Sequence, residues 1–236
     1  MPERRRNRIL SLLFDRGANF ETTRLCEVCA EVTSMSGAGI MLMFEDAPQG
    51  TVCTTNEVSS QLEQLQYTLG EGPCVDAYRE DRPVLEPNLV HPETLRWVAF
   101  TEAAVNTGAQ AVFGFPLQVG AVRLGALNLY RDSPGALDEE QYANALAASA
   151  IVAQAVLVLQ AKAPNGMLAQ ELERSSDFQY VVHQAAGMIA VQLSVNVTEA
   201  MIRLRAFAFG NERRLSQVAA EVVDRTLRFD SAGLDT

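Results

Sequence analysis

The chain has 236 residues, enough for one large domain or two small ones. Its 48% hydrophobic and 20% charged residues indicate a folded globular protein and exclude a disordered one. A net charge of −10 excludes non-specific binding of the whole protein to nucleic acid. Residues 1–165 contain 12 Lys and Arg against 20 Asp and Glu, whereas residues 166–236 contain 7 against 9. The nearly neutral C-terminal third therefore tolerates a nucleic-acid partner without requiring one.

The first residues imitate a secretory signal peptide. The basic run Arg4-Arg5-Arg6 precedes an apolar run at 9–14. Asp15 and Arg16 end the apolar run too early, and no small-residue cleavage site follows. We therefore expect a cytoplasmic protein.

Residues 20–33 follow a helical pattern. This helix contains a Cys-x-x-Cys pair, Cys26 and Cys29, but no second pair or nearby histidines complete a zinc site. Four cysteines do not form a disulfide scaffold in a chain of this size. We interpret Cys26 and Cys29 as small apolar residues buried in the helix, and we predict no metal site.

Four strands and one short helix are predicted next. Apolar runs bounded by turn residues predict the strands, and the last two are joined by a hairpin at Gly120-Ala121. The predicted strands are 40–44, 51–55, 111–117 and 124–130, and the short helix is 61–67.

The central segment reads Leu69-Gly70-Glu71-Gly72-Pro73-Cys74-Val75-Asp76-Ala77, followed by Arg82-Pro83-Val84. Together with the order helix, paired strands, irregular segment, two strands and closing helix, this run resembles the GAF domains of actinobacterial regulators over about residues 20–160. The resemblance implies an α+β fold, in which an antiparallel sheet carries flanking helices. It also implies a ligand pocket between the sheet and the irregular segment.

The same resemblance suggests which residues line that pocket. The candidate ligand-binding residues are Gly70, Glu71, Gly72, Trp97, Phe113, Phe115 and Asn128. For each aromatic residue among them, a place in the core is the alternative. No cofactor can be named, because haem lacks an axial ligand here and a bilin lacks a Cys-His attachment; a cyclic nucleotide stays open.

A capping box, Asp138 with Gln141, begins a helix that runs to about Gln160. Residues 142–161 contain no charge, which invites a transmembrane interpretation. Polar residues within the run, heavy alanine content and the lack of a basic asymmetry between its flanks argue against a membrane span. A helix that is apolar on more than one face needs burial on more than one side. We therefore expect a homodimer through this helix, on which Val152 and Val156 share one face, as do Leu146 and Ala150.

The helical pattern breaks at Ala163-Pro164-Asn165-Gly166. We predict that this break joins two domains, a sensor domain over residues 1–163 and a small all-α domain over 164–230. Residues 231–236 are expected to form a disordered tail.

The all-α domain is predicted to contain three helices. The first spans about 168–193, the second begins after a capping box at Asn196 and ends near Gly210, and the third begins near Leu215. Spacing of apolar residues predicts one buried stripe on each helix. The stripes are Phe178, Val181, Ala185, Met188 and Gln192; Ala200, Leu204 and Phe207; and Leu215, Val218, Ala219 and Val222.

Several short runs in these helices carry a second resemblance. They are Val182-His183-Gln184-Ala185-Ala186-Gly187-Met188-Ile189, Leu204-Arg205, Asn211-Glu212-Arg213-Arg214-Leu215 and Val218-Ala219-Ala220-Glu221-Val222-Val223. In this order they resemble the ANTAR domain, a three-helix RNA-binding module of bacterial antitermination regulators. The resemblance implies binding to paired stem-loops in nascent mRNA leaders. It departs from the family at Ala186, where the usual residue is lysine.

The arginines of this region fall into two groups. Arg203, Arg225 and Arg228 each follow a carboxylate by four residues, so we interpret them as members of salt-bridged helix faces. The other arginines have no such partner and suit phosphate, which a guanidinium binds bidentately. With the two positions implied by the resemblance, the candidate RNA-binding residues are Gln184, Gly187, Arg205, Arg213 and Arg214.

No motif indicates catalysis. The chain has no P-loop, nucleotide-binding glycine fingerprint or nucleophile elbow, so we predict that it is not an enzyme. The resemblances imply a cytoplasmic antitermination regulator that binds stem-loop RNA under control of a sensor domain. The alternative is a small-molecule-sensing or protein-interaction regulator that no longer binds RNA. DNA binding is disfavoured by the acidic chain.

Overall fold

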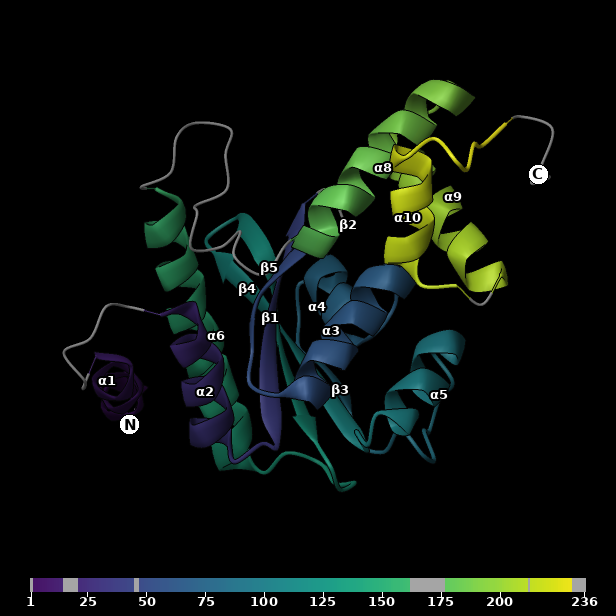
Figure 1. Cartoon of the computed structure of the whole chain (residues 1–236). Helices are drawn as coiled ribbons and strands as arrows, with labels where there is room; N and C mark the ends of the chain where they lie inside the picture. The colour runs from purple at the N-terminus through teal and green to yellow at the C-terminus, as the bar shows by residue number, and fades with distance from the viewer. Residues whose placement is uncertain (1, 15–20, 45–46, 162–176, 212, 231–236) are drawn as a thin grey trace. The chain divides into compact units, whose positions relative to one another are not determined.

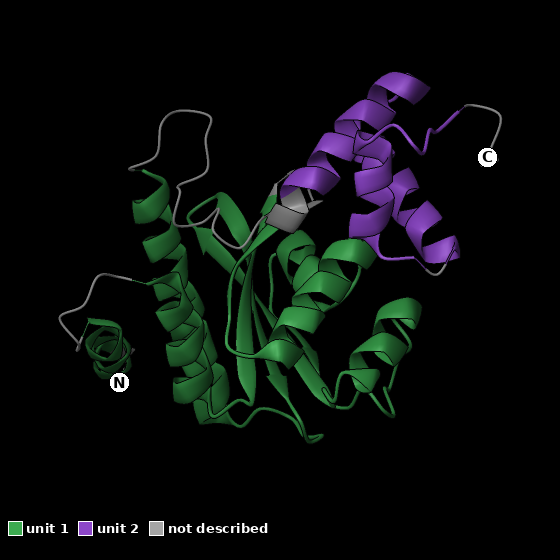
Figure 2. Cartoon of the chain, in the orientation of Figure 1, with its two compact units in different colours: residues 1–175 green, residues 176–236 purple. Residues whose placement is uncertain are grey.

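The computed structural model describes residues 2–14, 21–44, 47–161, 177–211 and 213–230 (Figure 1). The chain divides into two compact units, Met1–Ser175 and Ser176–Thr236 (Figure 2). The predicted joint at 163–166 and the predicted tail at 231–236 lie outside the described residues, as do residues 168–176 of the predicted first C-terminal helix. Each unit is described by itself below.

The first unit is built on a five-stranded antiparallel sheet with the order β2-β1-β5-β4-β3. Its strands are β1 (Gly37–Phe44), β2 (Ala47–Thr54), β3 (Val84–Glu86), β4 (Ala111–Val119) and β5 (Val122–Arg131). The four predicted strands are confirmed, and each begins earlier than predicted except β4. The hairpin between β4 and β5 is confirmed, with Gly120 at a φ of 60°. The three-residue edge strand β3 was not predicted.

Six helices flank the sheet among the described residues of this unit. They are α1 (Pro2–Phe14), α2 (Thr22–Thr33), α3 (Glu57–Leu69), α4 (Pro73–Glu80), α5 (Val98–Asn106) and α6 (Glu139–Gln160). The capping box of Asp138 and Gln141 is confirmed at the start of α6. Helix α3 begins four residues before the predicted helix, because Asn56 and Ser59 form a second capping box. The segment predicted to be irregular contains α4 and α5.

The helices form two layers on opposite faces of the sheet (Figure 1). Helices α2 and α6 cover one face, and α3 and α4 cover the other. Because successive side chains of a strand point to opposite faces, each strand contributes to two cores. Phe113 and Phe115 of β4 pack with the α2 and α6 layer. Val112 of β4 and Tyr130 of β5 pack with residues of α3 and α5.

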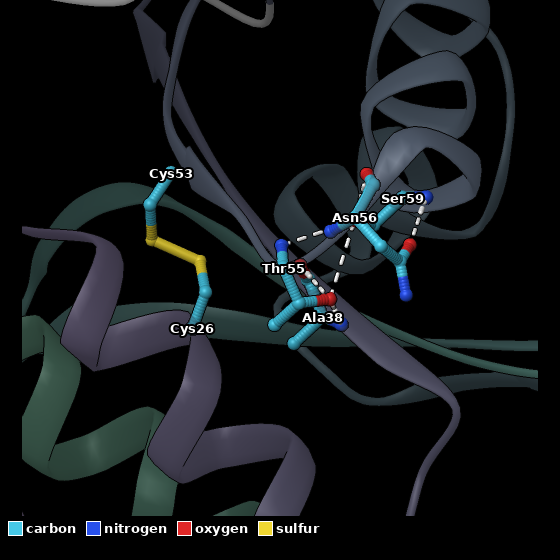
Figure 3. The surroundings of a disulfide bond; sticks show 6 residues. All are labelled: Cys26, Ala38, Cys53, Thr55, Asn56 and Ser59. Atoms are coloured by element: carbon cyan, nitrogen blue, oxygen red, sulfur yellow. Dashed lines mark hydrogen bonds between the residues drawn. A yellow bond between two sulfur atoms is a disulfide. The ribbon is translucent and has the colours of Figure 1, made fainter.

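A disulfide joins Cys26 of α2 to Cys53 of β2, with an S–S distance of 2.03 Å (Figure 3). The interpretation of Cys26 as an unmodified apolar residue is therefore wrong, although its burial is confirmed. Cys29 is buried and free. The pairing depends on a Cα–Cα separation of 6.1 Å across 27 residues of sequence, which spacing along a helix cannot reveal. The bond ties the helical layer to the edge strand of the sheet.

Helix α6 is long and apolar enough to cross a membrane, but half of its most apolar window is buried inside the unit. Val152 and Val156 are 1% and 2% exposed and belong to the core under the sheet. The prediction that these two valines form an intermolecular interface is therefore wrong. The exposed stripe of α6 carries Leu146 and Ala150, the other predicted pair, with Val158 and with Gln154, which accepts from Arg6 at 3.1 Å.

The second unit consists of α8 (Asp177–Leu193), α9 (Val197–Gly210) and α10 (Leu215–Val223), which pack on one another. Asn196 caps α9 by accepting from the amide of Glu199 at 2.8 Å, while the Glu199 carboxylate pairs with Arg203. The predicted stripe of α10 is fully buried. The buried stripes of α9 and α8 are Ala200, Met201, Leu204 and Ala208, and Val182, Ala185, Ala186 and Ile189.

The predicted stripe of α8 is thus confirmed as buried only at Ala185. Val181 and Met188 are only half-buried, and Phe178 lies outside the residues whose side chains are described. The true stripe recurs at i, i+3, i+4 and i+7 and contains two alanines in succession. Alanine packs against a neighbouring helix as readily as it faces water, so apolar spacing alone does not fix the stripe.

Close packing of α4 on the sheet depends on Gly114. A Cβ at this position would clash with the backbone carbonyl of Pro73, the first residue of α4. We expect Gly114→Ala to destabilise the first unit by about 1–3 kcal/mol, because backbone has to move to admit the methyl group. Gly187→Ala in α8 is the control, since its Cβ would meet no atom within 4 Å. This variant should gain about 0.5–1 kcal/mol from helix propensity. Urea unfolding of both variants measures the change in the free energy of unfolding, which should have opposite signs in the two variants. Equal changes would contradict the packing argument.

Candidate functional site

Polar side chains gather in the interior between the sheet and helices α3 and α4. Glu63 and Gln66 of α3 are 0% exposed, and Asn128 of β5 is 1% exposed. They reach the interior because the buried stripe of α3 runs through Ser59, Leu62, Glu63, Gln66 and Tyr67. A buried polar group without hydrogen bonds costs free energy, so such a cluster calls for a function.

Glu63 is the central ionisable group of this cluster. Burial raises the pKa of its carboxyl group from 4.5 to about 8, against an interaction with the Asn128 side chain that lowers it. Glu63 is therefore largely protonated near neutral pH. At normal hydrogen-bond geometry, its two oxygens, the Gln66 amide nitrogen and the Asn128 amide oxygen are without partners in the part of the chain that the structure describes.

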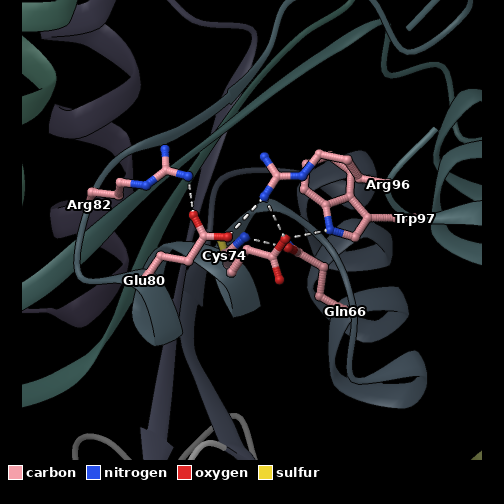
Figure 4. Close-up of polar contacts among 7 residues, drawn as sticks. Gln66, Cys74, Glu80, Arg82, Arg96 and Trp97 are labelled. Atoms are coloured by element: carbon pink, nitrogen blue, oxygen red, sulfur yellow. Dashed lines mark hydrogen bonds and ion pairs between the residues drawn. The ribbon is translucent and has the colours of Figure 1, made fainter. Parts of the chain in front are cut away.

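The loop Gly70–Pro73 closes over Gln66. Gly70 ends α3 at a φ of 67°, and Gly72 precedes α4 at a φ of 128°, both values that favour glycine. A Cβ at Gly72 would lie 2.7 Å from the Gln66 Oε1 atom. The backbone amide of Cys74 donates to this same oxygen at 2.8 Å (Figure 4). The loop is thus held against the polar cluster by the Gln66 side chain.

Cys74 adds a thiol to the cluster. Burial raises its pKa well above the usual value, and the nearby Glu63 raises it further, while an interaction with the Gln66 side chain lowers it. Burial likewise raises the pKa of Cys29 to about 12. Both free thiols are therefore protonated at neutral pH and are poor nucleophiles. Among the residues described, no group of three or more His, Cys, Asp and Glu could hold a metal ion.

Two carboxylates fasten the loop and α4 to α5. Glu71 accepts from the amide of Phe100 at 2.9 Å and so caps the first turn of α5. Asp76 accepts from Trp97 Nε1 at 2.9 Å and from Arg96 at 3.2 Å (Figure 4). Arg96 also pairs with Glu80 at 2.9 Å and lies over the Trp97 ring at 5.0 Å. These contacts are structural.

The structure separates the predicted ligand-binding residues into three groups. Gly70, Gly72 and Asn128 lie at the polar cluster. Glu71 and Trp97 hold α5, and Trp97 is buried with its nitrogen already bonded. Phe113 and Phe115 cannot share a site with the others, because they point into the core beneath α2 and α6.

The register of the sheet explains this correction. Gly114 pairs with Asn128, so these two residues share a face and the flanking phenylalanines take the opposite one. Glu63 and Gln66 were not among the predicted site residues. Their spacing of three residues, with Leu62 and Tyr67 on the same helical stripe, is the signal that could have revealed them.

The candidate RNA-binding residues of the second unit differ in exposure. Gln184 and Arg214 are exposed, and Gly187 is half-buried. Arg205 is half-buried, and its Nε and Nη2 atoms are covered, so only part of its guanidinium group is open to a phosphate. Arg213 forms an ion pair with Glu221. This pair was not predicted, because the two residues are eight positions apart and do not share one helix. Ala186 is 0% exposed, so a lysine there would enter the core rather than extend into solvent.

The predicted ion pairs of the other arginines are confirmed only in part. Arg203 pairs with Glu199 at 2.9 Å. Arg225 does not pair with Glu221, because that carboxylate binds Arg213 and α10 ends at Val223. The same helix end removes the i, i+4 geometry expected for Arg228.

Comparison with known proteins identifies the first unit. The family model described as GAF domain matches residues 22–157, more than half of the chain. The chain belongs to the GAF family. The matched range ends before α8 and leaves out the second unit. A comparison with curated proteins gives no match.

Three solved structures illustrate what the chain is similar to. The GAF domain of a phosphoenolpyruvate-protein phosphotransferase from Coxiella burnetii has a TM-score of 0.50 at 14% identity, covering 68% of this chain and 95% of that one. A domain attributed to a two-component sensor histidine kinase protein from Sinorhizobium meliloti 1021 has a TM-score of 0.48 at 19% identity, covering 58% and 89%. The chromophore-binding domain of a Stigmatella aurantiaca bacteriophytochrome has a TM-score of 0.47 at 10% identity, covering 66% and 60%.

The raised pKa of Glu63 predicts a pH dependence of stability in the GAF domain. The folded state holds a proton that the unfolded state releases above its pKa of about 4.5, so stability falls as pH rises from there to about 8. The free energy of unfolding should fall by at most about 1.4 kcal/mol per pH unit, the limit for one titrating proton. Glu63→Gln keeps the shape without the titration, so it should be more stable than the wild type at pH 8 and close to it at pH 4. Urea unfolding of both proteins across this range measures the difference. Parallel pH profiles would contradict a titrating Glu63.

Proposed function

We propose that this protein is a signal-responsive transcription antitermination regulator. Its GAF domain senses a small molecule, and its C-terminal helices act as an ANTAR-like domain that binds stem-loop RNA in mRNA leaders. The observation that carries the RNA-binding part is the resemblance of the ordered sequence runs to ANTAR, which fall on α8, α9, α10 and the connection before α10.

The sensor part rests on the buried polar cluster. Glu63, Gln66 and Asn128 offer hydrogen-bond donors and acceptors that the described residues leave unused. A ligand that supplies these partners recovers the cost of burying them. Such a ligand shifts the protein toward the conformation that binds it better, which is the thermodynamic requirement for a signal.

The RNA-binding part rests on exposed side chains of the second unit. Arg214 is exposed beside the N-terminus of α10, where partial positive charge also favours phosphate. Arg213 is held beside it by the pair with Glu221. Gln184 is exposed on α8, and the space beyond Gly187 is open, which suits close approach of an RNA backbone.

The second candidate function is a regulator whose C-terminal helices bind a protein and no RNA. It is favoured by the burial of Ala186 at the usual lysine position and by the covered nitrogens of Arg205. Crosslinking and sequencing of RNA bound to the protein in cells distinguishes the two. Enrichment of leader stem-loops supports antitermination, whereas libraries no richer than those of an untagged control overturn it.

We expect the charge of Arg214 to contribute directly to RNA affinity. Arg214→Gln should weaken binding to the enriched stem-loops and reduce the salt slope by about 0.7 to 0.9, the contribution of one neutralised phosphate. Thermal stability should change little, since Arg214 is exposed. Arg203→Gln is the matched control, because it removes the same charge from the same unit at a salt-bridged position. Equal effects of the two variants on affinity and salt slope would eliminate the Arg214 contact.

We also propose a homodimer that forms through the exposed stripe of α6. Leu146 and Val158 are 41% and 58% exposed on a helix that carries no charge from Tyr142 to Ala161. A second copy of the chain can cover this apolar stripe.

We place the protein in the cytoplasm and assign it no enzymatic role, in keeping with its protonated buried thiols. In that compartment the Cys26–Cys53 bond depends on the redox state.

The dimer is tested by charges on the exposed stripe. Leu146→Asp combined with Val158→Asp should yield a folded monomer, because like charges would face each other across the interface. Val191→Asp on α8 is the control, since Val191 is 81% exposed and belongs to the second unit. Sedimentation velocity with circular dichroism measures assembly and folding together. A wild-type protein that is monomeric throughout the micromolar range would disprove the dimer.

A further inference from the structure

The second unit contains a pocket that no candidate site above includes. Its volume is about 280 Å³, and it is lined by Met188 and Gln192 of α8 and by Arg225, Leu227 and Arg228 of the segment after α10. This size is near the lower end of small-molecule sites. Met188 and Leu227 contribute apolar side chains to the lining, Gln192 contributes an amide, and the two arginines contribute guanidinium groups.

The end of α10 places Arg225 at the pocket in an unusual conformation. The Arg225 amide donates to Val222 O at 3.1 Å and the Thr226 amide to Glu221 O at 2.9 Å, which together form a Schellman motif. Arg225 has a φ of 61°, a left-handed value at a position where glycine is the usual residue. An arginine in this conformation costs backbone free energy that a glycine would not. We infer that the arginine side chain has a role at this position.

The segment beyond Arg225 is held against α8 and α9. The amide of Phe229 donates to Gln192 Oε1 at 2.9 Å, and the Phe229 ring contacts that of Phe207 with centroids 5.3 Å apart. The Gln192 oxygen is thus used, so the group that this side chain offers to a ligand is its amide nitrogen. These anchors fix Leu227 and Arg228 beside Met188.

Among the described residues, the two arginines of the pocket form no ion pair with Asp224 or Asp230, the acids closest to them in the sequence. Arg225 and Arg228 are exposed, and within 177–211 and 213–230 no ion pair joins either one to an acid. Glu221, the expected partner of Arg225, pairs with Arg213. No acidic residue lines the pocket. Its electrostatic character is therefore that of an anion site.

We propose that this pocket binds one nucleotide unit, an unpaired nucleotide of the bound RNA. The base packs on Met188 and Leu227 with its edge toward the Gln192 amide, and the flanking phosphates bind Arg225 and Arg228. Sequence-specific RNA recognition uses unpaired bases that leave the stack, and arginine binds phosphate through its planar fork. The assignment rests on the proposed RNA-binding function and adds a specific contact to it.

The experiment uses the full chain with fluorescein-labelled RNA hairpins whose loops are randomised. Arg225→Gly and Arg228→Gln are compared with Arg203→Gln, which removes the same charge at the salt-bridged site on α9. Arg225→Gly should fold at least as stably as the wild type, because glycine prefers the left-handed conformation. Each pocket variant should weaken RNA binding by about tenfold, the effect of losing one charge-assisted hydrogen bond. Each should also lower the salt slope by about 0.7.

The outcomes separate this inference from the proposed function. If the wild type binds RNA and the pocket variants behave like Arg203→Gln, the pocket assignment is overturned and RNA binding stands. If the wild type binds none of the hairpins, the proposed function fails, and titration with AMP and UMP followed by NMR then tests the pocket alone. Chemical shift changes at Met188 that Arg225→Gly abolishes support a site for free nucleotides, whereas unchanged spectra overturn the pocket.

Discussion

The candidate sensor site depends on one constraint, which is that residue 114 is a glycine and has no Cβ atom. It lets the backbone at Pro73 reach the sheet, and this contact brings the loop Gly70–Pro73 over Gln66. Gln66 accepts from the amide of Cys74 and occupies the same interior as Glu63. The enclosure of the polar cluster thus follows from a backbone-to-backbone approach that only glycine at position 114 permits.

A protein gains nothing in stability from such an interior. Each buried polar group without a partner costs about 1–3 kcal/mol. In a sensor this cost has a use, because a ligand that completes the hydrogen bonds gains binding energy from it. The proton is itself a ligand of the cluster, since burial raises the pKa of Glu63 to about 8. Ligands that favour the charged and the neutral carboxyl group should therefore bind with opposite pH dependence.

In the second unit, one carboxylate determines the roles of several arginines. Glu221 lies four residues before Arg225, yet it pairs with Arg213 from the preceding connection. Arg213 is thereby restrained, and Arg225 is turned by the end of α10 toward the pocket beside Met188. Arg214 remains exposed at the start of α10. The distribution of basic groups proposed to contact RNA therefore depends on where α10 ends as much as on which residues are basic.

The sequence by itself determined the local elements. The Asp138 capping box, the Gly120 hairpin and the buried stripe of α10 all depend on residues a few positions apart, and all three are confirmed. The GAF resemblance likewise rests on a contiguous run. Tertiary structure alone decided that Phe113 and Asn128 lie on opposite faces, that Cys26 bonds Cys53 and that Ala186 is covered. Those outcomes depend on which surfaces meet in space, and local periodicity carries no information about distances between residues remote in the chain.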